Sequence, residues 1–235
     1  MKRTLLQTGD GSYTLHLPEW NEQYHSKHGA IAEALHVFIK EGLYYWSSEN
    51  PGMPVSILEI GFGTGLNALL TLLKSENPTT VQYTGVEAYP LDVEEALSLN
   101  YNLVLENQYC DKNADLPDLL QIYTQIHTSV WEKENFITKN FQLTKLQQKF
   151  SEISFDSCFD LIYFDAFGIR VQPELWTEEI FQKMYTALKE NGILVTYAAN
   201  GKARRAMQAV GFTVERLPGP PGKKEMLRAI KRNCQ

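Results

Sequence analysis

Cysteine is scarce in this sequence: there are three, Cys110, Cys158 and Cys234, far apart and without CxxC or CxxH spacing. An odd number at such spacing supports neither a disulfide framework nor a zinc site, so three free thiols are expected. No apolar run approaches the roughly 18 residues needed to span a bilayer, and Met1-Lys2-Arg3 leads into mixed polar sequence instead of the apolar core of a signal peptide. We therefore expect a soluble, cytoplasmic protein without a membrane partner.

Positive charge is also in short supply, with 22 Lys and Arg residues against 28 Asp and Glu residues and a net charge of −6. This balance argues weakly against a nucleic-acid partner, but the charge is uneven. Residues 202–235 contain nine basic residues against two acidic ones, which is +7 and leaves −13 for the rest. A basic end on an acidic body is typical of a phosphate-facing surface, and a solvated helix face with a charged terminus explains it equally well.

Short apolar runs alternate with amphipathic segments along the chain. After the run at 55–60 come glycines and then leucines at i, i+3, i+4 and i+7, which predicts a strand, a glycine turn and a helix. The same alternation continues toward the C-terminus. Strands are expected at 55–60, 81–87, 136–143, 159–165, 193–197, 212–217 and 226–230, and helices at 66–73, after Pro90, at 119–126, 177–188 and 203–210.

This order of elements indicates an α/β fold, a doubly wound, mostly parallel seven-stranded sheet with an antiparallel C-terminal edge strand. The Pro- and Gly-rich turn at 218–222 places the last two strands in a hairpin at the sheet edge. A chain of 235 residues with 43% hydrophobic residues suffices for one sizeable core and is short for two. We expect residues 1–50 to form an N-terminal extension and residues 51–235 to form the domain.

Three glycines at alternate positions, Gly61, Gly63 and Gly65, follow the first strand in the stretch LEIGFGTGL. Glycine adopts positive φ and lets another group approach the main chain closely. In an open parallel sheet, ligands bind beyond the carboxyl ends of the strands, where this turn, Glu87 and Asp165 all fall. The sequence therefore predicts a ligand site that these three strand ends share.

The kind of ligand follows from the spacing. Leu66 stands where a GxGxxG motif would need its third glycine, so the dinucleotide fingerprint is not satisfied. The motif is instead ExGxGxG, from Glu59 to Gly65, with Glu87 22 residues after Gly65. A carboxylate in that place can accept hydrogen bonds from both ribose hydroxyls. A nucleoside without a pyrophosphate fits best.

These residues resemble the class I methyltransferases that use S-adenosylmethionine and have a Rossmann-like fold. A closer similarity is to the tRNA 5-methylaminomethyl-2-thiouridine methyltransferase domain family. It lies in the segment Glu59 to Asn67 and in YHSKHGAIAEALHVFI (24–39), VEAYPL (86–91), YFDAFGIRVQPELW (163–176) and GKARRAMQAVGFTVERLPGPPGKKEML (201–227). In that family the domain is often the N-terminal half of a bifunctional enzyme, fused to a flavin-dependent oxidoreductase, and this chain stops before such a half.

The resemblance implies S-adenosyl-L-methionine as cofactor and no metal. Tyr24-His25-Ser26 belongs, by resemblance, to a lid over the cofactor, and residues 1–50 include a lid helix. His25 and His28 are interpreted as polar loop residues, and Trp20 and Trp176 as packing residues. The cofactor-binding residues that the resemblance implies are Tyr24, Glu59, Gly61, Phe62, Gly63, Thr64, Gly65, Asn67, Glu87, Ala88 and Asp165.

The reaction implied is transfer of a methyl group to the aminomethyl nitrogen of 5-aminomethyl-2-thiouridine at the wobble position of tRNA. Asp165 is the expected catalytic residue, because an alkylamine must lose a proton before its lone pair can attack. A strand-end acid that caps the next loop is the alternative for Asp165, and plain core is the alternative for Phe167. The partners implied are hypomodified tRNA and a separate oxidoreductase acting upstream. Expected substrate contacts are Phe167, Lys202, Arg204, Arg205, Lys223, Lys224 and Arg228.

Two departures from the family pattern stand out. The family's DGFAP…NP…W appears as Asp165-Ala166-Phe167-Gly168-Ile169…Gln172-Pro173…Trp176, with the acid, the ring and the Pro-to-Trp spacing kept. At Leu143-Thr144-Lys145 the family's usual Asp, which receives the adenine amino group, is missing. Adenine recognition therefore uses another group, or the segment aligns differently.

Two alternatives stay open at this point. One is a methyltransferase for a small amine or hydroxyl substrate, which the acidic body favours. The other is a non-catalytic module that keeps the cofactor fold and binds tRNA or a protein, which the altered residues after Asp165 leave open. Retention of Asp165 and of the glycine turn favours an enzyme.

Overall fold

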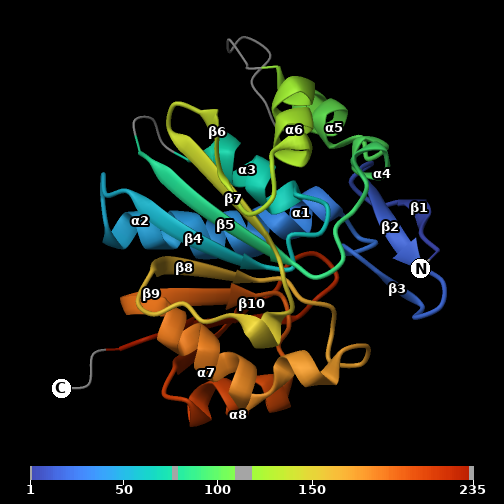
Figure 1. Cartoon of the computed structure of the whole chain (residues 1–235). Coiled ribbons are helices and arrows are strands. Elements are labelled where there is room, and N and C mark those ends of the chain that lie inside the picture. Colours follow the sequence, from blue (N-terminus) through green and yellow to red (C-terminus); the bar gives the residue numbers. More distant parts are fainter. Residues whose placement is uncertain (1, 76–78, 109–117, 233–235) are drawn as a thin grey trace.

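The computed structural model describes residues 2–75, 79–108 and 118–232. In these residues an eight-stranded sheet has the order β10-β11-β9-β8-β4-β5-β7-β6, and a small sheet β1-β2-β3 lies at one end of it (Figure 1). The large sheet contains β4 (Val55–Ile60), β5 (Val81–Glu87), β6 (Glu134–Thr138), β7 (Phe141–Gln147), β8 (Phe159–Phe164), β9 (Leu188–Thr196), β10 (Thr213–Pro218) and β11 (Glu225–Ile230). The small sheet contains β1 (Thr4–Gln7), β2 (Tyr13–Leu17) and β3 (Glu22–Gln23).

Helices cover both faces of the large sheet (Figure 1). The α-helices are α1 (Ala30–Ala34), α2 (Tyr45–Glu49), α3 (Leu66–Lys74), α4 (Val93–Leu97), α5 (Tyr101–Gln108), α6 (Leu119–Thr128), α7 (Glu178–Ala187) and α8 (Gly201–Ala209). A π-helical stretch, η1 (Leu35–Tyr44), joins α1 to α2 without a break, and η2 (Phe150–Glu152) and η3 (Pro173–Trp176) are short 3-10 helices.

Strands of the large sheet send alternate side chains into two apolar layers, as successive residues of a strand must. On β4, Ile57 packs in the layer of α1, η1, α3 and α6, whereas Leu58 and Ile60 pack in the layer of α7 and α8. On β8, Tyr163 and Phe164 divide in the same way. Burial on both faces explains why these strands are near-continuous apolar runs in the sequence.

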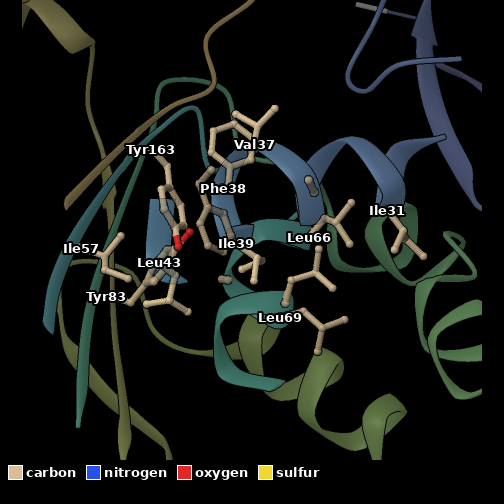
Figure 2. Close-up of a cluster of buried hydrophobic side chains, with 14 of the residues drawn as sticks. Ile31, Val37, Phe38, Ile39, Leu43, Ile57, Leu66, Leu69, Tyr83 and Tyr163 are labelled. Carbon is tan, nitrogen blue, oxygen red and sulfur yellow. The ribbon is translucent and has the colours of Figure 1, made fainter. Parts of the chain in front are cut away.

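The continuous helix of residues 30–49 is part of the core. Val37, Phe38 and Ile39 are at most 1% exposed, and the Phe38 and Tyr163 rings lie 5.1 Å apart (Figure 2). Gly42 allows this approach, because a Cβ there would lie 3.1 Å from Val195 Cγ2 and 3.2 Å from a Tyr163 ring carbon. This helix packs on the sheet, whereas a lid helix was expected within residues 1–50. If part of this segment covers the site, it would be the strands and loops before residue 30.

The doubly wound α/β prediction is confirmed, and two details differ. The single strand expected at 136–143 is a hairpin of β6 and β7, which adds an eighth strand. The last strand, β11, is antiparallel as expected, but it lies between β9 and β10, so the sheet edge is β10. A hairpin can attach to a sheet by either of its strands, and the local sequence pattern is the same in both cases.

Of the three cysteines, which were expected to be free thiols, Cys158 is an exposed free thiol, and Cys110 and Cys234 lie outside the described residues. α5 was not expected from the sequence. Within the described ranges, none of the helices combines the length and apolar character that a membrane crossing needs.

We predict that Phe38→Ala lowers the free energy of unfolding by about 3–5 kcal/mol, because it leaves a cavity between η1 and the sheet. Phe136→Ala is the matched control: Phe136 is 75% exposed on β6, and the expected loss is under about 1 kcal/mol. Urea denaturation followed by circular dichroism measures both. Equal losses in the two variants would contradict the packing described for η1.

Candidate functional site

A cavity of about 910 Å³ opens at the carboxyl ends of β4, β5 and β8, where the sequence predicts a ligand site. Part of its wall comes from the segment of Trp20 to His25 around β3, and part from the loops after β7 and β8. The cavity gathers most of the expected cofactor and catalytic residues, together with Phe167, an expected substrate contact: Tyr24, Gly61, Phe62, Gly63, Thr64, Asn67, Glu87, Ala88, Asp165 and Phe167. Glu59 and Gly65 are not in its lining.

The glycine turn has a backbone that only glycine adopts readily. Gly61, Gly63 and Gly65 have φ of 90°, 46° and 68°. A Cβ at Gly61 would lie 2.7 Å from the Asp165 carbonyl oxygen, so glycine is required for β4 and β8 to end side by side. The amides of Gly61 and Phe62 both donate to the Val86 carbonyl, at 3.0 and 3.1 Å, which fastens the turn to β5.

Thr64, in the middle of the turn, is fixed by three buried side chains. His25 Nε2 and Thr64 Oγ1 share a hydrogen bond of 2.7 Å. The Thr64 carbonyl accepts from the Tyr123 hydroxyl at 2.8 Å and from His127 Nε2 at 3.0 Å. Burial lowers the pKa of His25 and of His127 to about 4, so both rings are neutral at neutral pH. His25, interpreted as a loop residue, therefore holds the turn in place.

Glu87, at the end of β5, faces the cavity. Its carboxylate accepts from the Gly63 amide at 3.0 Å and from the Tyr89 amide at 2.9 Å, one bond to each oxygen. Each oxygen keeps a free lone pair, which can accept a hydrogen bond from a hydroxyl group. This is the donor–acceptor arrangement that a ribose diol needs.

Glu59 lies beneath the cavity, and burial raises its pKa well above the usual range. Its two oxygens accept from Asn67 Nδ2 at 2.8 Å and from the Tyr83 hydroxyl at 2.8 Å. The same Asn67 amide donates to Asp165 Oδ2 at 2.9 Å. Glu59 thus acts on the site through Asn67, and no part of it lines the cavity.

Asp165 is the carboxylate at the end of β8. Burial and then the charge of Glu33 raise its pKa to about 7, and the Asn67 hydrogen bond and the Lys223 charge only partly offset them. A group with this pKa is present as both acid and base near neutral pH, which suits it to accept a proton from a bound substrate.

Aromatic rings form one side of the cavity. Phe167 meets Tyr24 edge-on with ring centroids 5.1 Å apart, and it meets Trp20 edge-on at 5.7 Å. Trp20, interpreted as a packing residue, lines the cavity. Trp176 is 3% exposed and does pack, and its Nε1 donates to the Phe167 carbonyl at 2.8 Å, which positions the loop after Asp165.

The residues after β7 line the cavity although the sequence did not predict them there. Leu143-Thr144-Lys145, where a family Asp was sought, lie inside the strand, and Lys145 is 1% exposed with its Nζ donating to the His127 carbonyl. The strand ends at Gln147, paired with Glu87, and Lys149, Phe150 and Ser151 beyond it line the cavity. Strand pairing is the signal that would have found them, since the ends of β5 and β7 lie at the same level.

The basic residues expected to contact tRNA divide into two groups. Lys202, Arg205 and Lys224 are exposed, and Arg204 is half-buried. The prediction that Arg228 contacts tRNA is wrong, because this side chain is buried, with 7% of it exposed. Its guanidinium donates to Glu215 and Glu41 and lies 3.5 Å from the centroid of the Tyr45 ring. Lys223 also points inward, to Glu33. Spacing in the sequence could not separate exposed cations from those paired inside the molecule.

The described residues fit the cofactor that the sequence implies. Glu87 offers free lone pairs for a ribose, and the glycine turn presents bare backbone beside it. Nearby, Asn67 has a buried side-chain oxygen that lacks a partner among the described residues, and an ammonium group is one donor that could satisfy it. A nucleoside that also has an amino-acid portion carries the hydroxyl and ammonium donors that match these acceptors.

Comparisons with known proteins agree with this site. A model of the S-adenosyl-L-methionine-dependent methyltransferase family matches residues 116–232. The chain is 29% identical over 217 residues to the tRNA 5-methylaminomethyl-2-thiouridine biosynthesis bifunctional protein MnmC of Hydrogenovibrio crunogenus, and 28% identical over 222 residues to that of Leptospira interrogans. These matches cover 88% and 89% of this chain and 31% and 32% of the relatives, so the chain spans about a third of their length.

Solved structures show the same fold. MnmC2 from Aquifex aeolicus matches with a TM-score of 0.73 at 22% identity, over 97% of this chain and 70% of that one. Spermidine synthase from Thermotoga maritima matches with a TM-score of 0.50 at 18% identity, over 98% of this chain and 72% of that one.

The fold, the residues of the cavity and the matched family model all indicate the same cofactor, which is S-adenosyl-L-methionine. The chain is an S-adenosyl-L-methionine-dependent methyltransferase and is similar in sequence to the matched third of the MnmC proteins.

Proposed function

We propose that this methyltransferase acts in modification of the tRNA wobble uridine and methylates the aminomethyl nitrogen of 5-aminomethyl-2-thiouridine. The relatives named for that modification support it, and the single observation that carries it is Asp165. A carboxyl with a pKa of about 7, at the end of β8 in a cavity lined by aromatic rings, suits an amine that must lose a proton.

The chain's residues would bind and orient the two reactants. Glu87 would accept the ribose hydroxyls, and the glycine turn, fixed by His25, Tyr123 and His127, would lie against the sugar and amino-acid portion. When bound, S-adenosyl-L-methionine supplies an electrophilic methyl group on a sulfonium. The protein's main contribution is then proximity and alignment of the amine.

Asp165 would act on the amine. Its carboxylate would accept the proton that the nitrogen loses, and the Asn67 amide donates to one of its two oxygens. The nitrogen, with its lone pair free, would then take the methyl group that the bound cofactor would supply. Phe167, Trp20 and Tyr24 would hold the uracil ring by stacking or edge contacts, as aromatic side chains do with unstacked bases.

The charges around the cavity suit the aminomethyl uridine of a tRNA substrate but not its phosphate backbone. Carboxylates of Glu22, Glu174 and Glu179 also line the cavity, which favours an aminomethyl group and disfavours phosphates. The phosphate backbone would therefore lie outside, against Lys202, Arg205 and Lys224. An oxidoreductase that supplies the amine, as a separate chain or domain, is a proposed partner.

A small-amine substrate is the second candidate, because the same acidic lining suits any alkylamine. Labelled methyl transfer to tRNA with 5-aminomethyl-2-thiouridine, beside fully modified tRNA and free alkylamines, separates the two. Label in the hypomodified tRNA alone supports the proposal. Label in the free amines alone, with bound cofactor, would establish the second candidate instead.

We predict that Asp165→Asn lowers kcat/KM for methyl transfer by about 10²- to 10⁴-fold, because Asn cannot accept the proton. Asp156→Asn, an exposed residue with the same chemical change, should retain full activity. In the unsubstituted enzyme kcat/KM should rise with pH through about 7, since only the carboxylate form accepts a proton. A rate profile with the same inflection in Asp165→Asn would assign that titration to the substrate and contradict the proposed role.

We predict that Glu87→Gln weakens binding of S-adenosyl-L-methionine by about 10- to 100-fold, because charge-assisted hydrogen bonds to the ribose are lost. Titration calorimetry measures the affinity directly. Glu94→Gln, exposed on α4, is the control with the same loss of charge. Equal affinities for Glu87→Gln and Glu94→Gln would remove Glu87 from the cofactor site.

We predict that alanine at Lys202, Arg205 and Lys224 together weakens tRNA binding and lowers the slope of log affinity against log salt by about 2 to 3. Alanine at Lys40, Lys133 and Lys139, exposed lysines elsewhere on the molecule, is the control with the same charge change. Filter binding across a salt series measures both slopes. If the control set lowers the slope as much, the basic surface is general and not a tRNA site.

A further inference from the structure

The loop between β10 and β11, residues 219–224, packs against the N-terminal segment. Gly222 has φ of 86°, and a Cβ there would lie 2.2 Å from a His28 ring carbon, so the loop backbone rests directly on that ring. At the start of the loop, His36 Nε2 donates to the Pro218 carbonyl at 2.8 Å. These contacts hold the loop that carries Lys223 against residues 28–36.

Lys223 points into the molecule. Its ammonium forms an ion pair with Glu33, whose side chain is 8% exposed, and it lies 4.0 Å from the centroid of the Tyr197 ring. Glu33 also accepts from the Ser26 amide at 2.9 Å, next to His25 in the cavity wall. The pair therefore connects the β10–β11 loop, α1 and the segment that carries Tyr24 and His25.

Tyr197 connects this ion pair to Asp165. Its ring lines the cavity, and its hydroxyl donates to the carbonyl of Ala166, the residue after Asp165, at 2.9 Å. The ammonium of Lys223 covers the same ring. The ion pair is therefore connected through Tyr197 to the loop that begins with Asp165.

Two charged groups act on Asp165: Glu33 on α1 and Lys223 in the β10–β11 loop. Together with burial, the charge of Asp165 in turn raises the pKa of Glu59 on β4, beyond Asn67, and of the phenols of Tyr83, Tyr101 and Tyr197. Burial raises the pKa of each of these phenols, so they are neutral near pH 7. Among the described residues that act on Asp165 in this way, Lys223 is the cation.

We propose that Lys223 is a positioning residue for Asp165: held by Glu33 over the Tyr197 ring, its positive charge sets how readily Asp165 gives up and takes up a proton. This inference rests on the proposed role of Asp165 as the proton acceptor. The two halves of the ion pair act on Asp165 with opposite signs, because a nearby cation favours a carboxylate and a nearby anion disfavours it. An ion pair too far from Asp165 to act on it by charge would show no such opposition.

Four variants test this. Lys223→Met removes the cation, and the Asp165 titration should move up by about 0.5 to 1 pH unit. Glu33→Gln removes the anion and keeps an acceptor for the Ser26 amide, so the titration should move down. The double variant should return close to the starting value, and Lys223→Arg, which keeps the charge, should leave it nearly unchanged.

The first readout is the ¹³C shift of the Asp carboxyl groups in the full-length, substrate-free chain, titrated with pH. The Asp165 signal is the one that Asp165→Asn removes. The second readout is the pH profile of kcat/KM in the same variants, and circular dichroism confirms that each one is folded. Opposite shifts in Lys223→Met and Glu33→Gln support the inference.

Shifts of the same sign in those two variants, or no shift in either, would overturn it. The carboxyl titration does not depend on methyl transfer, so it also separates this inference from the proposed function. Opposite carboxyl shifts in a chain that methylates no aminomethyl uridine would uphold the charge-setting role of Lys223, and the proposed substrate alone would fail.

Discussion

Parallel pairing of β4 with β5 on one side and β8 on the other is the constraint on which the site depends. It brings the ends of three strands to one level, where the glycine turn, Glu87 and Asp165 follow. The pairing is tight enough that Gly61 contacts the Asp165 backbone, and no side chain would fit between them. The geometry of the candidate active site is therefore a property of the sheet before any ligand is bound.

Buried polar groups around the turn are costly to desolvate, and most of them form hydrogen bonds with one another. Asn67 bridges the carboxyl groups of Glu59 and Asp165, and Thr64 accepts from two side chains at its carbonyl. Such networks favour one arrangement, since any shift of the turn would break several hydrogen bonds at once. Stability of the fold and alignment of reactants thus draw on the same contacts.

The sequence predicted the parts of the site that local patterns encode. The glycine spacing, the acids at strand ends and the 3.6-residue periodicity of α3 and α7 all depend on near neighbours in the chain, and they placed Gly61, Glu87 and Asp165 correctly at the strand ends. The contact of His25 with Thr64 depends on a partner 39 residues away, the inward direction of Arg228 on one 187 residues away, and the place of β11 on strand order. No local pattern specifies these.

The place of β11 between β9 and β10 has a consequence for how the chain folds. β10 pairs only with β11 among the described strands, so this side of the sheet cannot close until residues 225–230 have left the ribosome. β10 precedes β11 in the sequence, so it stays without its partner until β11 forms, and over the same interval the edge of β9 stays exposed. Unpaired strand edges are templates for pairing with other chains, so this interval is open to aggregation.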